Sequence, residues 1–239
     1  MCNACSDAVD RRRLLTLAAA GAAAAMVGTG APRSFAADGP ATTLTADEAL
    51  AKLKDGNGKY VADPQLCTLN LTQQRTDVSG HQAPWASILS CADSRVPPEL
   101  IFGGLGLGEL FVARNAGNLA DTATIGTLEY GAAVLGSPLI VVLGHTKCGA
   151  VAAACDVVAK NATFPGSIGP MIQPILPAAL AVRDAAGDFV ANATVENAKR
   201  TAARLTAASP VIGGLVEAGK VKVAAALYDL ASGKVSFVG

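Results

Sequence analysis

The segment at 138–144, Pro-Leu-Ile-Val-Val-Leu-Gly, restricts the fold of this chain more than any other feature. It places five consecutive apolar residues between a proline and a glycine, which is typical of a strand buried on both faces. A shorter apolar run at 85–90 is also consistent with a buried strand, residues 109–114 form a further predicted strand, and helical patterns lie among them. Strands that alternate with helices predict an α/β fold: a mainly parallel central β-sheet flanked by helices.

The remaining elements are predicted from helix-capping residues and from residues that end helices or strands. Thr45 and Glu48 form a capping box, and the helix that they open is expected to end near Lys54, before two glycines. Residues 61–84 read as irregular. Further helices are expected at 121–135, from 148 onward and twice within 168–208 with a break near 187–188, and a C-terminal strand pair at 221–230 and 234–238.

Two short motifs directly follow predicted strands. Cys91, Asp93 and Arg95 come after the strand at 85–90, and His145 and Cys148 come after the strand at 138–144. The carboxyl ends of parallel strands share one edge of a sheet, where α/β proteins build their sites. The two motifs are therefore expected to meet.

Two thiolates, one imidazole and one carboxylate suit a tetrahedral zinc ion. Cys91, His145 and Cys148 would be ligands, and the fourth position would hold Asp93 in a closed state or water in an open one. An Asp93–Arg95 pair would draw the carboxylate off the metal and leave it as a proton acceptor. Zinc lowers the pKa of bound water to about 7, so hydroxide would form near neutral pH.

Each motif alone is weak evidence. Asp-x-Arg is a common salt bridge, and a closed structural zinc site stays an alternative. A phosphatase-type Cys-x5-Arg loop is excluded, because Pro97 stands six residues after Cys91. His81 falls in a predicted loop and is expected at the surface.

The N-terminus predicts export. Arg11–Arg13 precede an apolar Ala/Gly-rich run, and Ser34–Ala36 offers a small-residue cleavage site. We expect a twin-arginine signal peptide at 1–36, a linker at 37–44 and one domain at 45–239, in the periplasm or secreted. The alternative is a retained membrane anchor; after cleavage we expect no stable membrane insertion.

The net charge and the remaining cysteines restrict the function less than the motifs do. The formal net charge is zero, so no nucleic-acid partner is expected. Cys67 and Cys155 are read as buried free thiols, with a disulfide between them as the alternative.

The motifs resemble those of the β-class carbonic anhydrases. The first signature is Cys91-Ala-Asp-Ser-Arg95-Val-Pro-Pro-Glu, the second is Phe111-Val-Ala-Arg-Asn-Ala-Gly-Asn118, and the third is Glu129-Tyr130 followed by 141–149, Val-Val-Leu-Gly-His-Thr-Lys-Cys-Gly. The resemblance covers roughly residues 45–239.

The resemblance implies a zinc lyase (carbonate dehydratase) that interconverts carbon dioxide and bicarbonate through zinc-bound hydroxide, with one zinc per subunit. It implies that Asp93 and Arg95 form the catalytic dyad. The implied substrate-binding residues are Gln82, Phe111, Tyr130 and Gly149, and the two aromatic residues come from the neighbouring subunit of a homodimer or higher even oligomer.

One position departs from part of the family. Members with a regulatory bicarbonate site have a tryptophan three residues before the first cysteine ligand, where this chain has Ile88, so no such site is expected beside Val96 and Arg114. Hydrolysis of carbon disulfide or carbonyl sulfide by the same ligands, and a non-catalytic zinc protein with Asp93 as fourth ligand, remain alternatives.

Overall fold

The structure is a computed structural model that describes residues 40–64 and 71–239. The predicted signal peptide, the first part of the predicted linker and Cys67 lie outside these residues. Within the described ranges, no helix has both the length and the apolar character needed to cross a bilayer.

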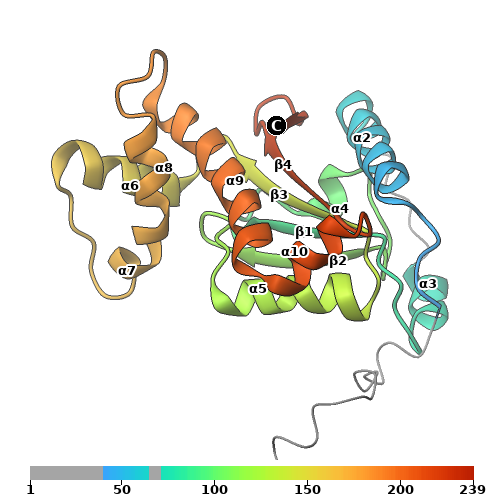
Figure 1. Cartoon of the computed structure of the whole chain (residues 1–239). Coiled ribbons are helices and arrows are strands. Elements are labelled where there is room, and N and C mark those ends of the chain that lie inside the picture. The colour runs from blue at the N-terminus through green and yellow to red at the C-terminus, as the bar shows by residue number, and fades with distance from the viewer. Residues whose placement is uncertain (1–39, 65–70) are drawn as a thin grey trace, which may run out of the picture. The chain divides into compact units, whose positions relative to one another are not determined.

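A five-stranded sheet forms the centre of the fold, in the order β2-β1-β3-β4-β5 (Figure 1). Its parallel strands are β2 (Leu110–Asn115), β1 (Ala86–Cys91), β3 (Leu139–His145) and β4 (Lys222–Tyr228), and β5 (Val235–Val238) is antiparallel to β4. The central strands β1 and β3 are buried along their whole length. The predicted fold class and the C-terminal strand pair are confirmed.

Helices cover both faces because successive side chains of a strand point to opposite sides. Ile88 and Val141 pack against α2 (Ala46–Ala62) and α4 (Pro98–Ile101). Their neighbours Leu89 and Val142 pack on the other face. That face is covered by α5 (Thr122–Glu129), the π-helical turn η2 (Tyr130–Val134), α9 (Phe189–Ala208) and α10 (Pro210–Glu217).

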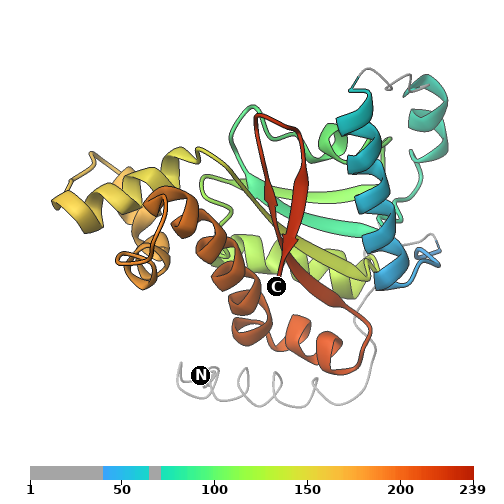
Figure 2. The ribbon, with the colours of Figure 1, turned by 90° about the horizontal axis from the view of Figure 1, so that it is seen from above.

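A group of short helices lies beyond the carboxyl ends of the strands, and we call it the helical lobe. Figures 1 and 2 both show it beside the sheet, next to the start of α9. It consists of α6 (Gly149–Lys160), α7 (Ile168–Ile172), η3 (Gln173–Ile175) and α8 (Leu176–Ala181). Its core is continuous with Cys91 and Cys148, so the lobe closes the apolar side of the predicted metal site.

The expected break near 187–188 is confirmed, because Asp188 caps α9 by accepting a hydrogen bond from the backbone N–H of Ala191 at 2.7 Å. The helical pattern before it is split further than expected. Pro174 and Pro177 stand in the first turns of η3 and α8, and proline cannot donate a backbone hydrogen bond within a continuous helix.

The helix that begins at the capping box continues past its predicted end at Lys54 to Ala62. Gly56 does not break it, because this glycine is where α2 contacts the end of α4: a Cβ built on Gly56 overlaps the carbonyl of Phe102. The prediction of an irregular segment at 61–84 was also wrong, since α3 (Leu71–Asp77) lies within it. The sequence pattern predicted no element at the position of α10.

Candidate metal centre

Cys91 is the last residue of β1, and its side chain is buried. The strand pairing runs one residue beyond it, where the N–H of Ala92 donates to the carbonyl of Asn115 at 3.0 Å. Cys91 therefore stands on a rigid element at the carboxyl edge of the sheet, where a precise ligand position is easiest to maintain.

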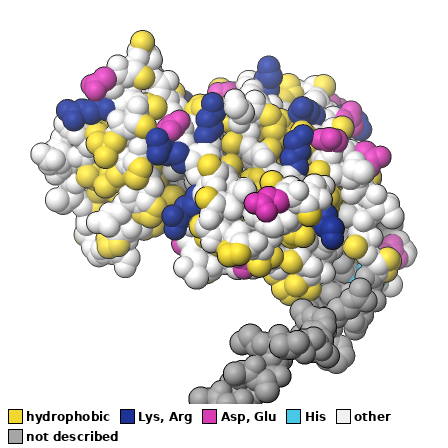
Figure 3. Space-filling view, viewed as in Figure 1, with side chains coloured by type: hydrophobic (Ala, Val, Ile, Leu, Met, Phe, Trp, Pro, Cys, Tyr) yellow, Lys and Arg dark blue, Asp and Glu magenta, His cyan; other side chains and the backbone are white. Residues whose placement is uncertain are grey.

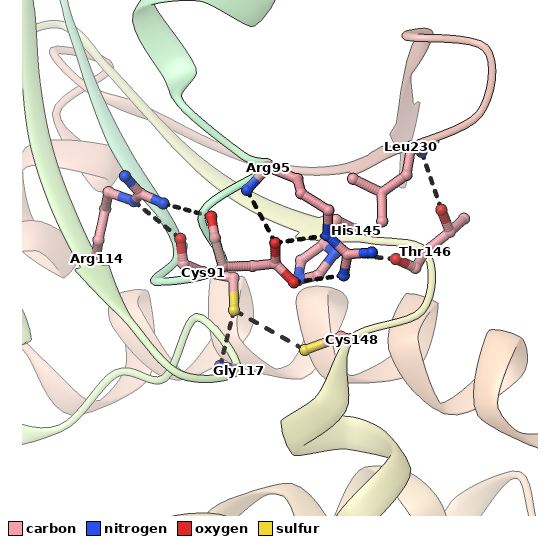
Figure 4. Close-up of polar contacts among 9 residues, drawn as sticks. Cys91, Arg95, Arg114, Gly117, His145, Thr146, Cys148 and Leu230 are labelled. Carbon is pink, nitrogen blue, oxygen red and sulfur yellow. Dashed lines mark hydrogen bonds and ion pairs between the residues drawn. The ribbon is translucent and has the colours of Figure 1, made fainter.

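His145 and Cys148 reach the same edge from β3. His145 ends the strand with no exposed surface, and Cys148 is the N-cap residue of α6. The two residues between them form a tight turn in which Lys147 has φ +58°. Thr146 anchors this turn to the end of β4: its N–H donates to the carbonyl of Tyr228, and its hydroxyl accepts from the N–H of Leu230 (Figure 4).

The three predicted ligands meet. One ligand atom each of Cys91, His145 and Cys148 lies within 4.8 Å of the others, and the two sulfurs are 4.0 Å apart. Nδ1 of His145 lies 2.9 Å from the carbonyl oxygen of Thr146, so the fitting tautomer donates from Nδ1 and leaves Nε2 with a lone pair.

Nε2 of His145 is fully buried and has no hydrogen-bond partner among the described residues. A buried polar atom without a partner is costly unless another group satisfies it. An unpaired imidazole nitrogen beside two cysteine sulfurs fits a zinc ion, which takes nitrogen and sulfur ligands in tetrahedral geometry. The donor set thus supports the predicted cofactor.

The side chains of Cys91 and Cys148 are hydrogen-bonded to each other. The pKa of Cys91 is lowered, because the Cys148 thiol donates a hydrogen bond to the Cys91 thiolate and the N–H of Gly117 also approaches its sulfur at 3.4 Å. The pKa of Cys148 is raised by that contact and by burial. Both sulfurs ligate a metal as thiolates, so a cation bound at this centre would displace thiol protons.

Asp93 lies next to the cluster but is held by Arg95. The guanidinium donates from Nε to Oδ1 at 2.9 Å and from Nη2 to Oδ2 at 2.6 Å, and the backbone N–H of Arg95 donates to Oδ1 at 3.0 Å. Arg95 thereby keeps the pKa of Asp93 well below its usual range. Oδ2 of Asp93 is 3.9 Å from Nε2 of His145, which is the arrangement expected of the open state.

Arg114 fixes the backbone of this loop, a role that the sequence reading missed. Its guanidinium donates to the carbonyls of Cys91 at 2.9 Å and of Asp93 at 2.6 Å (Figure 4). The available signal was the place of Arg114 within the second signature, as the last residue of the strand predicted at 109–114. Which carbonyls it binds depends on the pairing of β1 with β2.

The predicted substrate residues are divided between two places. Gly149 is the first residue of α6 and directly follows Cys148, so it lies at the metal centre. Phe111 pairs with Ser87, four residues before Cys91 along β1, which corresponds to about 13 Å at a rise of ~3.3 Å per residue. Gln82 precedes β1 altogether.

Phe111 and Tyr130 form a tilted aromatic pair with ring centroids 6.1 Å apart. The chain can bring Phe111 against η2 because residue 131 is glycine: a Cβ there would lie 2.8 Å from the ring. Within one chain, this pair and Gln82 lie toward the amino-terminal end of the strands, away from the metal centre.

Other sequence predictions can be placed as well. Ile88 is fully buried in the core, His81 is exposed, and Cys155 is a buried free thiol. Positive and negative side chains are interspersed on the face shown in Figure 3, and apolar side chains gather over the helical lobe.

We call residues 116–121, which follow β2, the metal loop, because the N–H of Gly117 within it approaches the Cys91 sulfur. A cleft of about 770 Å³ lies beside this loop. Its wall includes Leu119 and Asp121 from that loop, Met171 from the helical lobe, and Asn197 and Arg204 from α9. None of the three candidate ligands lines it, so this cleft is separate from the metal centre.

Comparisons with known proteins agree with this geometry. Residues 86–235 match the family model described as carbonic anhydrase. The chain is 36% identical over 183 residues to a carbonic anhydrase of Mycolicibacterium smegmatis, covering 77% of this chain and 88% of that protein. Carbonic anhydrase 2 of Mycobacterium tuberculosis is also 36% identical over 183 residues, covering 76% and 87%.

Solved structures show the same fold. A β-carbonic anhydrase of Aspergillus fumigatus superimposes with a TM-score of 0.63 at 26% identity, covering 80% of this chain and 89% of that one. A tetrameric β-carbonic anhydrase of Sordaria macrospora has a TM-score of 0.62 at 24% identity, covering 81% and 96%. The family model, the relatives and the shared fold agree with the signatures at Cys91 and His145, and the chain belongs to the β-class carbonic anhydrase family.

Proposed function

We propose that this protein catalyses the reversible hydration of carbon dioxide to bicarbonate and a proton, with one zinc ion per chain held by Cys91, His145 and Cys148. The observation that carries the proposal is the buried Nε2 of His145, which has no hydrogen-bond partner among the described residues and belongs to a side chain clustered with two cysteine sulfurs. Zinc at such a centre lowers the pKa of a bound water to near neutrality.

The chain's own residues supply the rest of the chemistry. Asp93 is the proton acceptor: Arg95 keeps it ionised and orients both carboxylate oxygens. Gly149 lies in the first turn of α6, where backbone N–H groups lack partners within the helix. In this proposal the N–H of Gly149 donates to a substrate oxygen beside Cys148.

Gln82, Phe111 and Tyr130 complete the site from a second copy of the chain. Their position toward the other end of the strands supports this, because no single chain brings them to its own metal centre. A homodimer or a higher even oligomer follows, and one similar structure is tetrameric.

Two alternatives differ in substrate or in the fourth ligand. Carbon disulfide or carbonyl sulfide would use the same ligands. A closed, non-catalytic zinc site would need Asp93 to leave Arg95, which donates three hydrogen bonds to it. These hydrogen bonds from Arg95 to Asp93 favour the catalytic form, in which Asp93 is not a metal ligand.

Stopped-flow hydration of carbon dioxide between pH 6 and pH 9, with zinc content measured on the same samples, tests the proposal. We expect one zinc per chain and activity that EDTA or dipicolinate removes and zinc restores. Carbonyl sulfide and carbon disulfide are assayed in parallel. Full zinc loading without hydration would refute the proposal, and faster turnover of a sulfur substrate would favour the hydrolase.

The residues at 1–36 support a further proposal, export by the twin-arginine route with cleavage after Ala36. N-terminal sequencing of protein from the periplasmic or culture fraction tests it. An intact Met1 in the membrane fraction would indicate a retained anchor instead.

A further inference from the structure

Asn197 joins α9 to the metal loop through a side-chain hydrogen bond. It is 2% exposed, and its Nδ2 donates to the backbone carbonyl of Gly117 at 2.9 Å. Nothing in the sequence motifs singles it out, because it stands 80 residues from its partner in the middle of an amphipathic helix.

Gly117 links this contact to a metal ligand. Its own N–H donates to Sγ of Cys91 at 3.4 Å (Figure 4). Gly117 has φ +83°, and a Cβ on it would lie 2.8 Å from Cδ1 of Ile175, so only glycine fits here. One peptide group of Gly117 therefore faces the sulfur, and the next faces Asn197.

The backbone around Gly117 needs support from outside. Asn118 follows it with φ +47°, and two successive residues in the left-handed region persist only where surrounding contacts hold them. Asn115 holds the far side of the turn, where its amide binds the N–H and carbonyl of Leu119. Asn197 holds the Gly117 carbonyl itself.

We propose that Asn197 is a positioning residue of the metal centre: by fixing the Gly117 carbonyl, it keeps the Gly117 N–H directed at the Cys91 sulfur. A hydrogen bond to a ligating thiolate withdraws electron density from it and so tunes the metal. The inference rests on the metal centre of the proposed function.

Asn57 provides a matched control. Like Asn197, it is a buried asparagine whose amide donates to the backbone. Its two acceptors are the carbonyls of Ile101 at 3.0 Å and Gly233 at 2.8 Å. These contacts join α2 to α4 and to the β4–β5 turn, not to the metal loop. Its loss removes buried hydrogen bonds of the same kind without touching Cys91.

Cobalt-substituted protein reports on the sulfur ligands through its sulfur-to-metal charge-transfer band. In Asn197→Leu we expect this band at longer wavelength than in the wild type, because the thiolate regains electron density. We also expect zinc affinity, measured by chelator competition, to fall by about 10- to 100-fold. Asn57→Leu should lower the melting temperature and leave both the band and the affinity unchanged.

A folded Asn197→Leu protein with the wild-type band and affinity overturns the proposal, and so does an equal band shift in Asn57→Leu. A measurement on the wild type needs no variant. In protein loaded with ¹¹³Cd, we expect scalar coupling between the Gly117 amide proton and the metal through the sulfur, and its absence also overturns the proposal. Failure of the wild type to bind cobalt or cadmium would instead count against the metal centre of the proposed function.

Discussion

Two side-chain hydrogen bonds join Arg95 to Asp93 and leave the nearer carboxylate oxygen 3.9 Å from Nε2 of His145. The carboxylate is thus close enough to receive a proton at the metal centre, but it is bound elsewhere. Because a bidentate guanidinium pair is among the strongest hydrogen-bonded pairs, we expect Arg95 to decide whether Asp93 acts as an acceptor or as a ligand.

Removal of either partner should therefore abolish activity for different reasons. Asp93→Asn should lower carbon dioxide hydration by about 10²- to 10⁴-fold, the usual contribution of a general base, and keep one zinc per chain. Arg95→Met should also be inactive, because the freed Asp93 closes on the metal. The double variant should then bind an added anion such as azide more tightly than Arg95→Met, as measured on the cobalt proteins.

Arg75→Met serves as the control for loss of a surface arginine, because Arg75 lies on the distant helix α3. Near wild-type hydration by Asp93→Asn would contradict the assigned role.

The proposal that each site is built from two copies of the chain predicts complementation between inactive variants. Asp93→Asn and Gln82→Leu should each be inactive as homodimers. In a mixture of chains, half of the dimers are mixed, and one of their two sites carries neither change. We expect about a quarter of wild-type activity if the site is built from both subunits of a twofold dimer.

The test uses co-expressed chains with different affinity tags and a hydration assay on the purified mixed dimer, which isolates the restored site. If Gln82 served the metal centre of its own chain, mixing would restore nothing.

The glycines of α2 should respond in opposite ways to alanine. Gly56→Ala places a methyl group against the Phe102 carbonyl and should destabilise the fold by about 1–3 kcal/mol, as overpacking does. Gly58 is exposed, and a Cβ added to it would meet no other atom, so Gly58→Ala should stabilise the helix by about 0.5–1 kcal/mol. Urea unfolding at constant pH measures both, and equal effects at the two positions would contradict the packing argument.

The support that Arg114 gives to the backbone of Cys91 and Asp93 should require an arginine at this position. Arg114→Lys keeps the charge, but its donors lie on a single nitrogen, whereas Arg114 reaches the carbonyls of Cys91 and Asp93 from two separate nitrogens. We expect Arg114→Lys and Arg114→Met to lose zinc affinity by a similar factor, about 10-fold or more, as loss of supporting contacts does. Chelator competition measures this, and wild-type affinity in the lysine variant would show that charge alone is sufficient.

The burial of the Cys155 thiol predicts that the protein loses stability at high pH. Burial raises the pKa of its thiol to about 11 from 9.0. Above pH 9 the unfolded chain releases this proton while the folded chain retains it, so stability is complete below pH 9 and falls as the pH rises toward 11. The loss is at most about 1.4 kcal/mol per unit of pKa difference.

Comparison of the wild type with Cys155→Ala isolates this group, because all other titrations are common to both proteins. The difference in unfolding free energy between them should shrink between pH 9 and pH 11. A difference that stays constant across this range would show that Cys155 does not titrate as described.

Local patterns in the sequence determined the parts of the fold whose cause is local. Apolar runs placed β1, β2 and β3 to within one residue, the Thr45 capping box marked the start of α2, and the expected break near 187–188 preceded α9. Because the carboxyl ends of parallel strands share one edge, the meeting of Cys91, His145 and Cys148 could also be predicted.

Only the tertiary structure decided features that depend on contacts between distant segments. The sequence pattern treats Gly56 as a helix breaker, and only its approach to Phe102 explains why the helix continues. The separation of Phe111 from Cys91 follows only from the register that pairs Phe111 with Ser87. Asn197 joins Gly117 through packing of α9 on the metal loop. The sequence by itself specified the ligands, because their chemistry is intrinsic to their side chains, and the tertiary structure decided what holds those ligands in place, because a hydrogen bond across 80 residues exists only in the folded chain.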